Sequence, residues 1–355
     1  MNVLIVRLGS LGDIIHALPV AAALADRFPG GRVDWLVDAR YRTILDYVPV
    51  VSRRLVVSTS RGPSAQNAAT RMDARVFAGR RALAAAVGEL RRGHYDLALD
   101  LQGLLKSALL ARLSGARRVA GFATGHLRER AARLFYTETV DPGGARHVVD
   151  KNLAMLRTVG VTGAPRRFPL DVPPSPVVGE VQQRLGLAND GLFALINPGA
   201  AWPNKRWPPE RFGAVAAAVR SRHGIPSAVL WGPSEGALAR EVENRSDGAA
   251  IVAPPTSIAE LVQLARAACL MIAGDTGPLQ IAAAAGTPIV GLFGPTDPER
   301  NGPWDPADLT LSRYEACVCH YRRRCRRKSE CLADISVEDL VAAIDRRLAA
   351  SALRR

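Results

Sequence analysis

The sequence lacks the features that would place it across a membrane or in a secretory pathway. Its 355 residues contain no uninterrupted apolar run of the roughly 20 residues that a membrane-spanning helix requires. The apolar N-terminus is not typical of a signal peptide, because its cation, Arg7, comes late and Asp13 and His16 interrupt the apolar stretch. We therefore expect a cytoplasmic protein.

Lysine and negative charge are both scarce. The chain has 47 lysines and arginines against 33 acidic residues, a net charge of +14. Such a charge suits nucleic acid, an anionic membrane surface or a phosphorylated substrate, although nucleotide bias toward arginine also produces it. An ammonium group does not substitute freely for a guanidinium group, so each retained lysine is a weak candidate for a specific role or is kept by chance. The lysines are Lys106, Lys151, Lys205 and Lys328.

Two nucleotide-binding signatures are also missing. The first glycine-containing turn reads GSLGD rather than G-x-G-x-x-G, and the pattern G-x-x-x-x-G-K-S/T occurs nowhere. Dinucleotide oxidoreductases and P-loop enzymes therefore lose their main support.

What the sequence does contain is an alternation of apolar strand-like runs and helical patterns, which predicts parallel sheets covered by helices. The alternation occurs twice, on either side of a Pro-rich stretch. We predict an N-terminal domain at 1–165, a linker at 166–190 and a C-terminal domain at 191–335. A last helix at 336–355 could pack back on either domain, and we expect the N-terminal one. Ligands of such sheets bind beyond the carboxyl ends of the strands, so we expect two doubly wound, Rossmann-like α/β domains that face a cleft.

Asp13 stands where the first strand gives way to a helix expected from about Asp13 to Arg27. An acid at a helix start is most often an N-cap. The functional alternative is a general base at a strand tip. The sequence pattern alone leaves both open.

The stretch GDTGPLQIAAAAG (274–286) predicts an anion site in the second domain. The Thr276 and Gly277 amides would precede a helix begun by Pro278 and suit a pyrophosphate. Asp275 would repel phosphate, so it orients the loop or binds a sugar hydroxyl. Lys205, in another strand-to-helix loop, is able to neutralise a leaving diphosphate. The alternatives are a capped turn and a solvated lysine.

Three residues of the first domain are candidates for holding an anionic acceptor: Arg61, Gln102 and Lys106. Glu235 follows a strand of the second domain, where an acid accepts hydrogen bonds from ribose hydroxyls. Each of the four, taken singly, is also typical of a surface residue.

Four cysteines crowd the C-terminal part with the spacing C-x-C-x₅-C-x₅-C. Thiolates at such density bind zinc or iron, whereas the absence of two C-x₂-C pairs leaves ordinary reduced thiols as the alternative. We predict a structural zinc or iron site, and the ligands would be Cys317, Cys319, Cys325 and Cys331.

Taken together, these stretches resemble family 9 glycosyltransferases, the ADP-heptose:lipopolysaccharide heptosyltransferases. The similar segments keep the order of the family and span nearly the whole chain. They are VLIVRLGSLGDIIHALP, DLQGLLKSALL, NPGAAWPNKRWPPERF, LWGPSE, GDTGPLQIAAAAGTP and GLFGPTDPERNGP.

The resemblance implies a GT-B fold and an inverting, metal-independent transfer of heptose from ADP-heptose to a Kdo or heptose acceptor of the lipopolysaccharide inner core. Asp13 matches the general base and Lys205 the residue at the donor phosphates. No catalytic cofactor is implied. The expected donor-site residues are Lys205, Glu235, Asp275, Thr276, Gly277, Gln280, Gly199 and Ala200. The expected acceptor-site residues are Ser10, Gly12, Arg61, Gln102 and Lys106.

The chain departs from the family at Gln280, where some members carry His, and at Ala200 and Ala201, where some carry hydroxyl residues. This leaves room for another nucleotide-sugar or a protein acceptor, and a basic, non-catalytic nucleic-acid-associated protein is the alternative from another class. We expect as partners an ADP-sugar, a lipid-linked oligosaccharide and the anionic inner face of the inner membrane, with peripheral attachment; nucleic acid is not expected.

Overall fold

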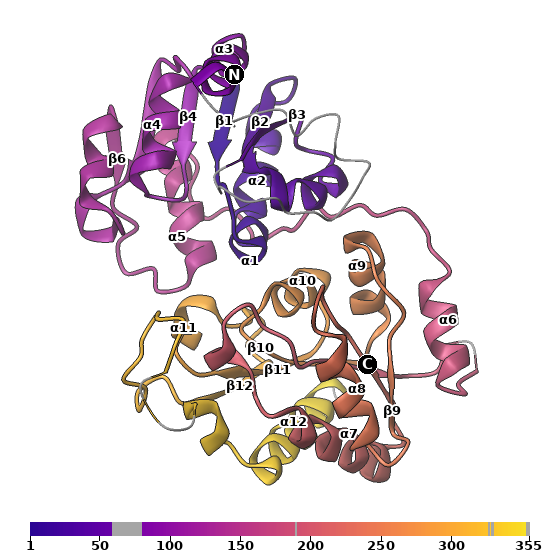
Figure 1. Cartoon of the computed structure of the whole chain (residues 1–355). Helices are drawn as coiled ribbons and strands as arrows, with labels where there is room; N and C mark the ends of the chain where they lie inside the picture. Colours follow the sequence, from indigo (N-terminus) through magenta and orange to yellow (C-terminus); the bar gives the residue numbers. More distant parts are fainter. Residues whose placement is uncertain (59–79, 189, 326, 328–329, 353–355) are drawn as a thin grey trace. The chain divides into compact units, whose positions relative to one another are not determined.

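The computed structural model describes residues 1–58, 80–188, 190–325, 327 and 330–352. The chain forms two compact units, Met1–Asp171 and Val172–Arg355, which Figure 1 shows in indigo to magenta and in pink to yellow. The division falls inside the Pro-rich segment 166–190. Each unit is a parallel α/β sheet, as the alternation of apolar runs and helical patterns predicted.

The first unit is built on a sheet with the strand order β3-β2-β1-β4-β5-β6, in which every pairing is parallel. Its described strands are β1 (Asn2–Val6), β2 (Arg32–Asp38), β3 (Arg53–Val57), β4 (Leu97–Asp100), β5 (Arg118–Phe122) and β6 (Glu138–Val140). Its described α-helices are α1 (Leu11–Ile15), α2 (Leu18–Arg27), α3 (Arg80–Arg91), α4 (Leu105–Leu113) and α5 (Val148–Ala154). Its described 3₁₀ helices are η1 (Ala39–Tyr47), η3 (Thr124–His126), η4 (Arg130–Phe135) and η5 (Met155–Val159).

The second unit has the strand order β12-β11-β10-β7-β8-β9, again parallel throughout. Its described strands are β7 (Ala194–Asn197), β8 (Ser227–Val229), β9 (Ala250–Val252), β10 (Leu270–Gly274), β11 (Ile289–Phe293) and β12 (Leu309–Ser312). Its described α-helices are α6 (Val177–Arg184), α7 (Pro209–His223), α8 (Gly236–Asn244), α9 (Ile258–Ala267), α10 (Gly277–Ala285), α11 (Pro298–Asn301) and α12 (Val337–Ala352). Two 3₁₀ helices complete the list: η6 (Pro203–Lys205) and η7 (Cys331–Asp334).

The two sheets share one topology. When the strands of each unit are numbered from its own first strand, both follow the order 3-2-1-4-5-6 of a doubly wound fold. The direction of winding reverses between β1 and β4 in the first unit and between β7 and β10 in the second. Ligands of this fold bind at that switch point, beyond the carboxyl ends of the strands. The fold therefore indicates where each unit holds its site.

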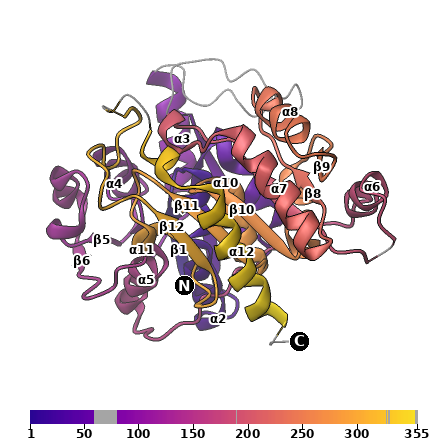
Figure 2. The same ribbon diagram turned by 90° about the horizontal axis from the view of Figure 1, so that it is seen from below.

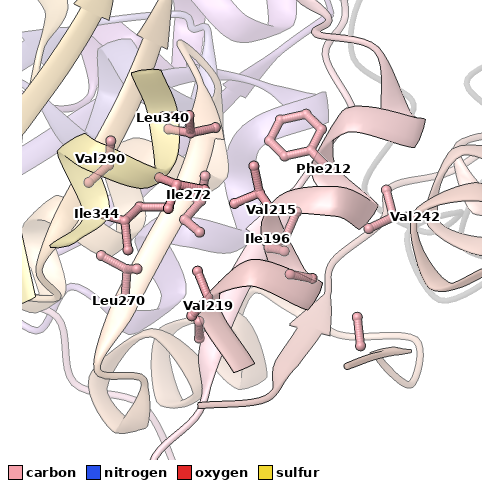
Figure 3. Packing of buried hydrophobic residues seen from close by; sticks show 14 of the residues in the cluster. Ile196, Phe212, Val215, Val219, Val242, Leu270, Ile272, Val290, Leu340 and Ile344 are labelled. Atoms are coloured by element: carbon pink, nitrogen blue, oxygen red, sulfur yellow. The ribbon is translucent and has the colours of Figure 1, made fainter. Parts of the chain in front are cut away.

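The strands are continuous apolar runs because helices cover both faces of each sheet. In the second unit, Ile196, Leu270, Ile272 and Val290 from the sheet pack against helical side chains such as Val215 (Figure 3). Burial of this apolar surface is the main stabilising term for such a domain.

The N-terminal helix is divided, whereas the sequence predicted one helix from about Asp13 to Arg27. The structure has α1 and α2, with Ala17 as the N-cap of the second. Pro19 lies at the start of α2 and has no N–H to continue the hydrogen-bond ladder from α1. The division leaves Asp13 in a separate short helix directly after β1.

The last helix, α12, packs in the second unit, against α7, β11 and β12 (Figure 2). Leu340 and Ile344 enter the core, and Arg347 forms an ion pair with Asp308, with Nε 2.9 Å from Oδ1. Burial raises the pKa of Asp308 to about 6, although hydrogen bonds from Ile289 and Arg347 oppose the rise. We had expected this helix to pack on the first domain. These contacts correct that expectation, because they place the helix in the core of the second unit.

None of the helices in the described residues has both the length and the apolar composition that crossing a bilayer requires.

Candidate active site

The switch point of the first unit brings together the segments that follow β1 and β4. Val6 lies opposite Asp100 in the pairing of these strands. Two residues past that pair, Gln102 Oε1 accepts a hydrogen bond of 2.7 Å from the Leu8 amide. Gln102, predicted to bind an acceptor, therefore uses its carbonyl oxygen to join the two loops.

Asp13 lies in this segment, with its side chain 32% exposed. Ser10 is the N-cap of α1, and Asp13 is the third residue of the helix. One carboxylate oxygen, Oδ2, accepts hydrogen bonds from the Ser10 amide at 2.9 Å and the Ser10 hydroxyl at 3.0 Å. This is the acid half of a capping box rather than an N-cap. The structure thus corrects the cap hypothesis and keeps the carboxylate part-exposed at the strand tip.

The other carboxylate oxygen of Asp13 is held by Arg7, which the sequence reasoning did not select. Arg7 Nη2 lies 2.5 Å from Asp13 Oδ1, and its Nη1 donates to the Leu101 carbonyl at the end of β4. The guanidinium is buried. A buried cation of this kind requires a nearby negative charge, and Asp13 supplies it. Both oxygens of the acid are therefore fixed in direction.

A buried network supports the loop after β4. Asp100 accepts hydrogen bonds from the Tyr136 hydroxyl at 2.7 Å and the Ser107 hydroxyl at 2.9 Å, and also from the amides of Gln102 and Gly103. Burial raises the pKa of Asp100, and these donors oppose the rise. The network fixes the turn that carries Gln102.

The remaining predicted acceptor residues of the first unit are placed as follows. Ser10 and Gly12 lie in the α1 segment beside Asp13, and Lys106 is exposed near the start of α4. Arg61 lies outside the described residues. Their roles stay predictions.

The switch point of the second unit holds a second ion pair, at the ends of β7 and β10. Lys205 Nζ lies 2.6 Å from Asp275 Oδ2, with the side chains 15% and 11% exposed. The ammonium also lies 4.8 Å from the ring centre of Trp202, a cation–π contact. The pair joins the loop after β7 to the loop after β10. The sequence placed both residues in strand-to-helix loops but did not predict the ion pair between them.

Beside this pair, the start of α10 presents two amides. Within the described part of the chain, neither the Thr276 nor the Gly277 N–H donates to a protein acceptor. Thr276 is held by its own hydroxyl, which donates to the Gly274 carbonyl at 3.1 Å. Asn197 Nδ2 donates to the Gly199 carbonyl at 3.0 Å and so shapes the neighbouring loop. Open amides at a helix start beside an ammonium group suit a diphosphate.

The other predicted donor-site residues lie around the same strand ends. Glu235 accepts from the Gly232 amide at 3.1 Å, and its carboxylate lies directly against Gly199, where a side chain on that glycine would collide with it. Ala200 is buried, and its carbonyl accepts from Arg206 Nε at 2.8 Å. Gln280 Nε2 donates to the Asn301 carbonyl at 2.8 Å and so joins α10 to α11.

The described residues do not support the metal site that was predicted for the four-cysteine cluster. Cys317, Cys319 and Cys331 are buried together, and Cys325 packs against them, with its Sγ 3.7 Å from that of Cys319. Among the described residues, however, no group of three or more His, Cys, Asp or Glu side chains is arranged to hold a metal ion. Burial, together with the neighbouring thiols of Cys317 and Cys325, raises the pKa of Cys331 to about 12.

The segment that carries these cysteines instead supports the Lys205 loop. Asn204, next to Lys205, donates from Nδ2 to the Arg322 carbonyl at 2.8 Å, and the Arg323 guanidinium lies 6.0 Å from the Trp202 ring centre. The Trp207 indole donates to the Ile335 carbonyl at 3.1 Å. These contacts fix both ends of the loop. The spacing of residues in the sequence does not predict them.

The family is decided by comparison with known proteins. Residues 83–330 match the family model described as Glycosyltransferase family 9 (heptosyltransferase). The chain belongs to glycosyltransferase family 9. This family 9 glycosyltransferase is 30% identical to lipopolysaccharide heptosyltransferase 1 of Pseudomonas aeruginosa, over 92% of this chain and 87% of the relative. It is 27% identical to lipopolysaccharide heptosyltransferase 3 of Escherichia coli K12, over 95% of each.

Solved structures show that the glycosyltransferase has the GT-B fold of its family. A family 9 glycosyl transferase from Veillonella parvula superposes with a TM-score of 0.77 at 23% identity and covers 98% of this chain and 97% of its own. The Escherichia coli heptosyltransferase WaaC with ADP gives 0.72 at 22% identity, with 98% of this chain and 100% of its own covered.

Proposed function

We propose that this glycosyltransferase transfers heptose from ADP-heptose to a sugar of the lipopolysaccharide inner core. The observation that carries the proposal is the donor half-site of the second unit: Lys205, paired with Asp275, beside the two open amides of Thr276 and Gly277. The names of the relatives, lipopolysaccharide heptosyltransferases 1 and 3, support the substrate class.

The donor half-site acts on the leaving group. As the bond from the anomeric carbon to the diphosphate breaks, negative charge grows on the phosphate oxygens. The Lys205 ammonium and the amides stabilise that charge where a metal ion does so in other enzymes. Asp275 cannot bind phosphate, so it orients Lys205 and accepts a hydrogen bond from a donor hydroxyl. Glu235 accepts from the ribose.

Asp13 serves as the general base in the first unit. It removes the proton of the acceptor hydroxyl while that oxygen attacks the anomeric carbon on the face opposite the leaving ADP, and the configuration inverts. Assistance of this kind is worth about 10²–10⁴ in rate. Arg7 and Ser10 each hold one oxygen of Asp13 and so fix its direction.

The proposed acceptor determines where in the cell we expect the enzyme to act. The inner core is built on a lipid, so we place the enzyme in the cytoplasm, attached peripherally to the inner membrane. The net charge of +14 favours an anionic lipid surface.

Two measurements test the proposal. Purified protein is incubated with ADP-heptose and a Kdo–lipid A acceptor, with and without a chelator, and the product linkage is determined by NMR. Thermal shifts are compared across ADP-, UDP-, GDP- and CDP-sugars. We expect an inverted linkage, chelator-insensitive transfer and a shift with the ADP-sugar.

Other results would change the assignment. A shift with a different nucleotide-sugar, or transfer only to a protein, would keep the fold and replace the substrates. Salt-sensitive nucleic-acid binding with no nucleotide-sugar shift would overturn the proposal.

A further inference from the structure

Exposed apolar side chains gather on two neighbouring helices of the first unit. Of the large hydrophobic residues that the described structure leaves exposed, three lie on α4 and η4, which pack against each other. Leu105 and Leu109, one turn apart on α4, are 43% and 40% exposed, and Leu134 on η4 is 84% exposed. Figure 1 labels α4 on the first unit. Single exposed leucines are ordinary, whereas a group of them marks an interaction surface.

The stretch of chain that carries α4 and η4 is strongly basic. Between residues 101 and 137 the chain has a single acidic residue, Glu129, which accepts a hydrogen bond from the Leu105 amide. The exposed cations on these two helices or next to η4 are Lys106, Arg112, Arg128, Arg130 and Arg133. We call the leucines Leu105, Leu109 and Leu134 with these cations the α4–η4 surface.

We propose that the α4–η4 surface docks the enzyme on an anionic phospholipid bilayer. Apolar side chains that enter the headgroup region together with cations that face anionic lipids are the two attractions that hold a peripheral protein on a membrane. This inference deepens the proposed function, because it names the surface by which the enzyme reaches a lipid-linked acceptor.

Two other occupants fit the surface less well. A second copy of the chain would set five cations against the same cations, with Glu129 as the acidic residue available to each side. Nucleic acid would satisfy the arginines, but phosphate contacts are polar and leave Leu134 and Leu109 unused. An anionic bilayer uses both kinds of side chain.

The test measures binding of the full chain to phosphatidylcholine–phosphatidylglycerol vesicles and to pure phosphatidylcholine vesicles by co-sedimentation. Two double variants remove one attraction each: Leu109→Ser with Leu134→Ser, and Arg128→Gln with Arg130→Gln. The matched control is Leu192→Ser with Arg184→Gln, which changes a leucine that is 44% exposed and an exposed arginine of the second unit. Circular dichroism and thermal unfolding verify that every variant is folded.

We expect the wild-type enzyme to prefer the anionic vesicles and to dissociate as salt is raised. Each patch variant should lose about tenfold or more in vesicle partitioning, and the control should lose nothing. All variants should retain transfer to a soluble, lipid-free acceptor oligosaccharide. Because vesicle binding is measured without sugars, an absent transferase activity would refute the proposed function and leave this result standing.

Equal binding to both kinds of vesicle, patch variants that bind like the wild type, or a control that loses as much as they do would overturn the proposal. So would an RNA homopolymer that binds as tightly as the vesicles and is lost in the patch variants.

Discussion

Two segments of this chain build the same local structure and differ in what surrounds it. Before α1, Ser10 and Asp13 form a capping box, and before α9, Ser257 and Glu260 form another. Glu260 accepts from the Ser257 amide at 2.8 Å, as Asp13 does from the Ser10 amide at 2.9 Å. A serine followed three residues later by an acid therefore does not distinguish a structural acid from a catalytic one.

The difference lies in the strand that precedes each box. Asp13 follows β1, which borders the switch point, and its second oxygen faces the buried Arg7. Glu260 follows β9, the edge strand, and its second oxygen accepts from the Ser175 hydroxyl at 3.2 Å. Topology, rather than the motif, favours Asp13 as the base, and Arg7 holds one of its carboxylate oxygens in a fixed direction.

Replacing each acid by its amide tests most directly whether the two acids differ in function. Asp13→Asn should lower kcat by about 10²–10⁴ because the amide cannot take up a proton. Glu260→Gln, the matched control, should leave kcat unchanged. Steady-state kinetics on both variants, with thermal unfolding to establish that they fold, measure the effect. An Asp13→Asn enzyme of near wild-type rate would remove the base assignment.

Substitutions in the Lys205–Asp275 ion pair should affect ADP binding, unlike substitutions in the Arg7–Asp13 pair, because Lys205 and Asp275 belong to the donor half-site. Lys205→Met should lower kcat by about 10²–10³ and weaken ADP binding, because the charge on the leaving diphosphate loses its cation. Lys151→Met on α5 is the control. Calorimetric titration with ADP and initial rates provide the two readouts. Normal ADP affinity in Lys205→Met would place this lysine outside the phosphate site.

The sequence was sufficient to predict the positions of the strand-to-helix loops. It was not sufficient to predict the hydrogen-bond and ion-pair partners of the side chains in these loops. Buried parallel strands are continuous apolar runs, so the segments after β7 and β10 that carry Lys205 and Asp275 were predicted correctly, as was the strand before Asp13. Arg7 was missed because its burial depends on the Leu101 carbonyl, 94 residues away in sequence. The role of Gln102 was also not predictable, because its side chain accepts a hydrogen bond from the Leu8 amide, which is equally distant in sequence. Cysteine spacing likewise does not determine whether four sulfurs converge on an ion or pack as thiols.

Arg7 tests the difference between the two capping boxes, because it contacts the acid of the α1 box, whereas a serine hydroxyl contacts the acid of the α9 box. Arg7→Met should lower kcat and leave both KM values unchanged, because Arg7 acts through Asp13, and it should lower the free energy of unfolding by about 1–3 kcal/mol. Arg7→Lys should restore part of kcat. Kinetics and urea unfolding of both variants test this. A raised acceptor KM with an unchanged kcat would instead make Arg7 a substrate contact.

The smallest effect is expected at the α9 box, where the acid contributes only to stability. Hydrogen bonds from the Ser257 amide and hydroxyl lower the pKa of Glu260 from its ordinary value of 4.5. A lowered pKa in the folded state means that the stabilisation is complete above that ordinary value and is lost as pH falls through the folded-state pKa.

Ser257→Ala should therefore lower the free energy of unfolding by about 1 kcal/mol near neutral pH, and Glu260→Gln should lower it by less, because the carboxylate is largely solvated. Urea unfolding across the acidic range should show the wild type and Glu260→Gln converging as pH falls. A difference between the two proteins that stays constant down to strongly acidic pH would mean that the ionised form of Glu260 contributes nothing to the box. Its structural role would then rest on hydrogen bonds that the neutral acid also makes and that the amide does not reproduce.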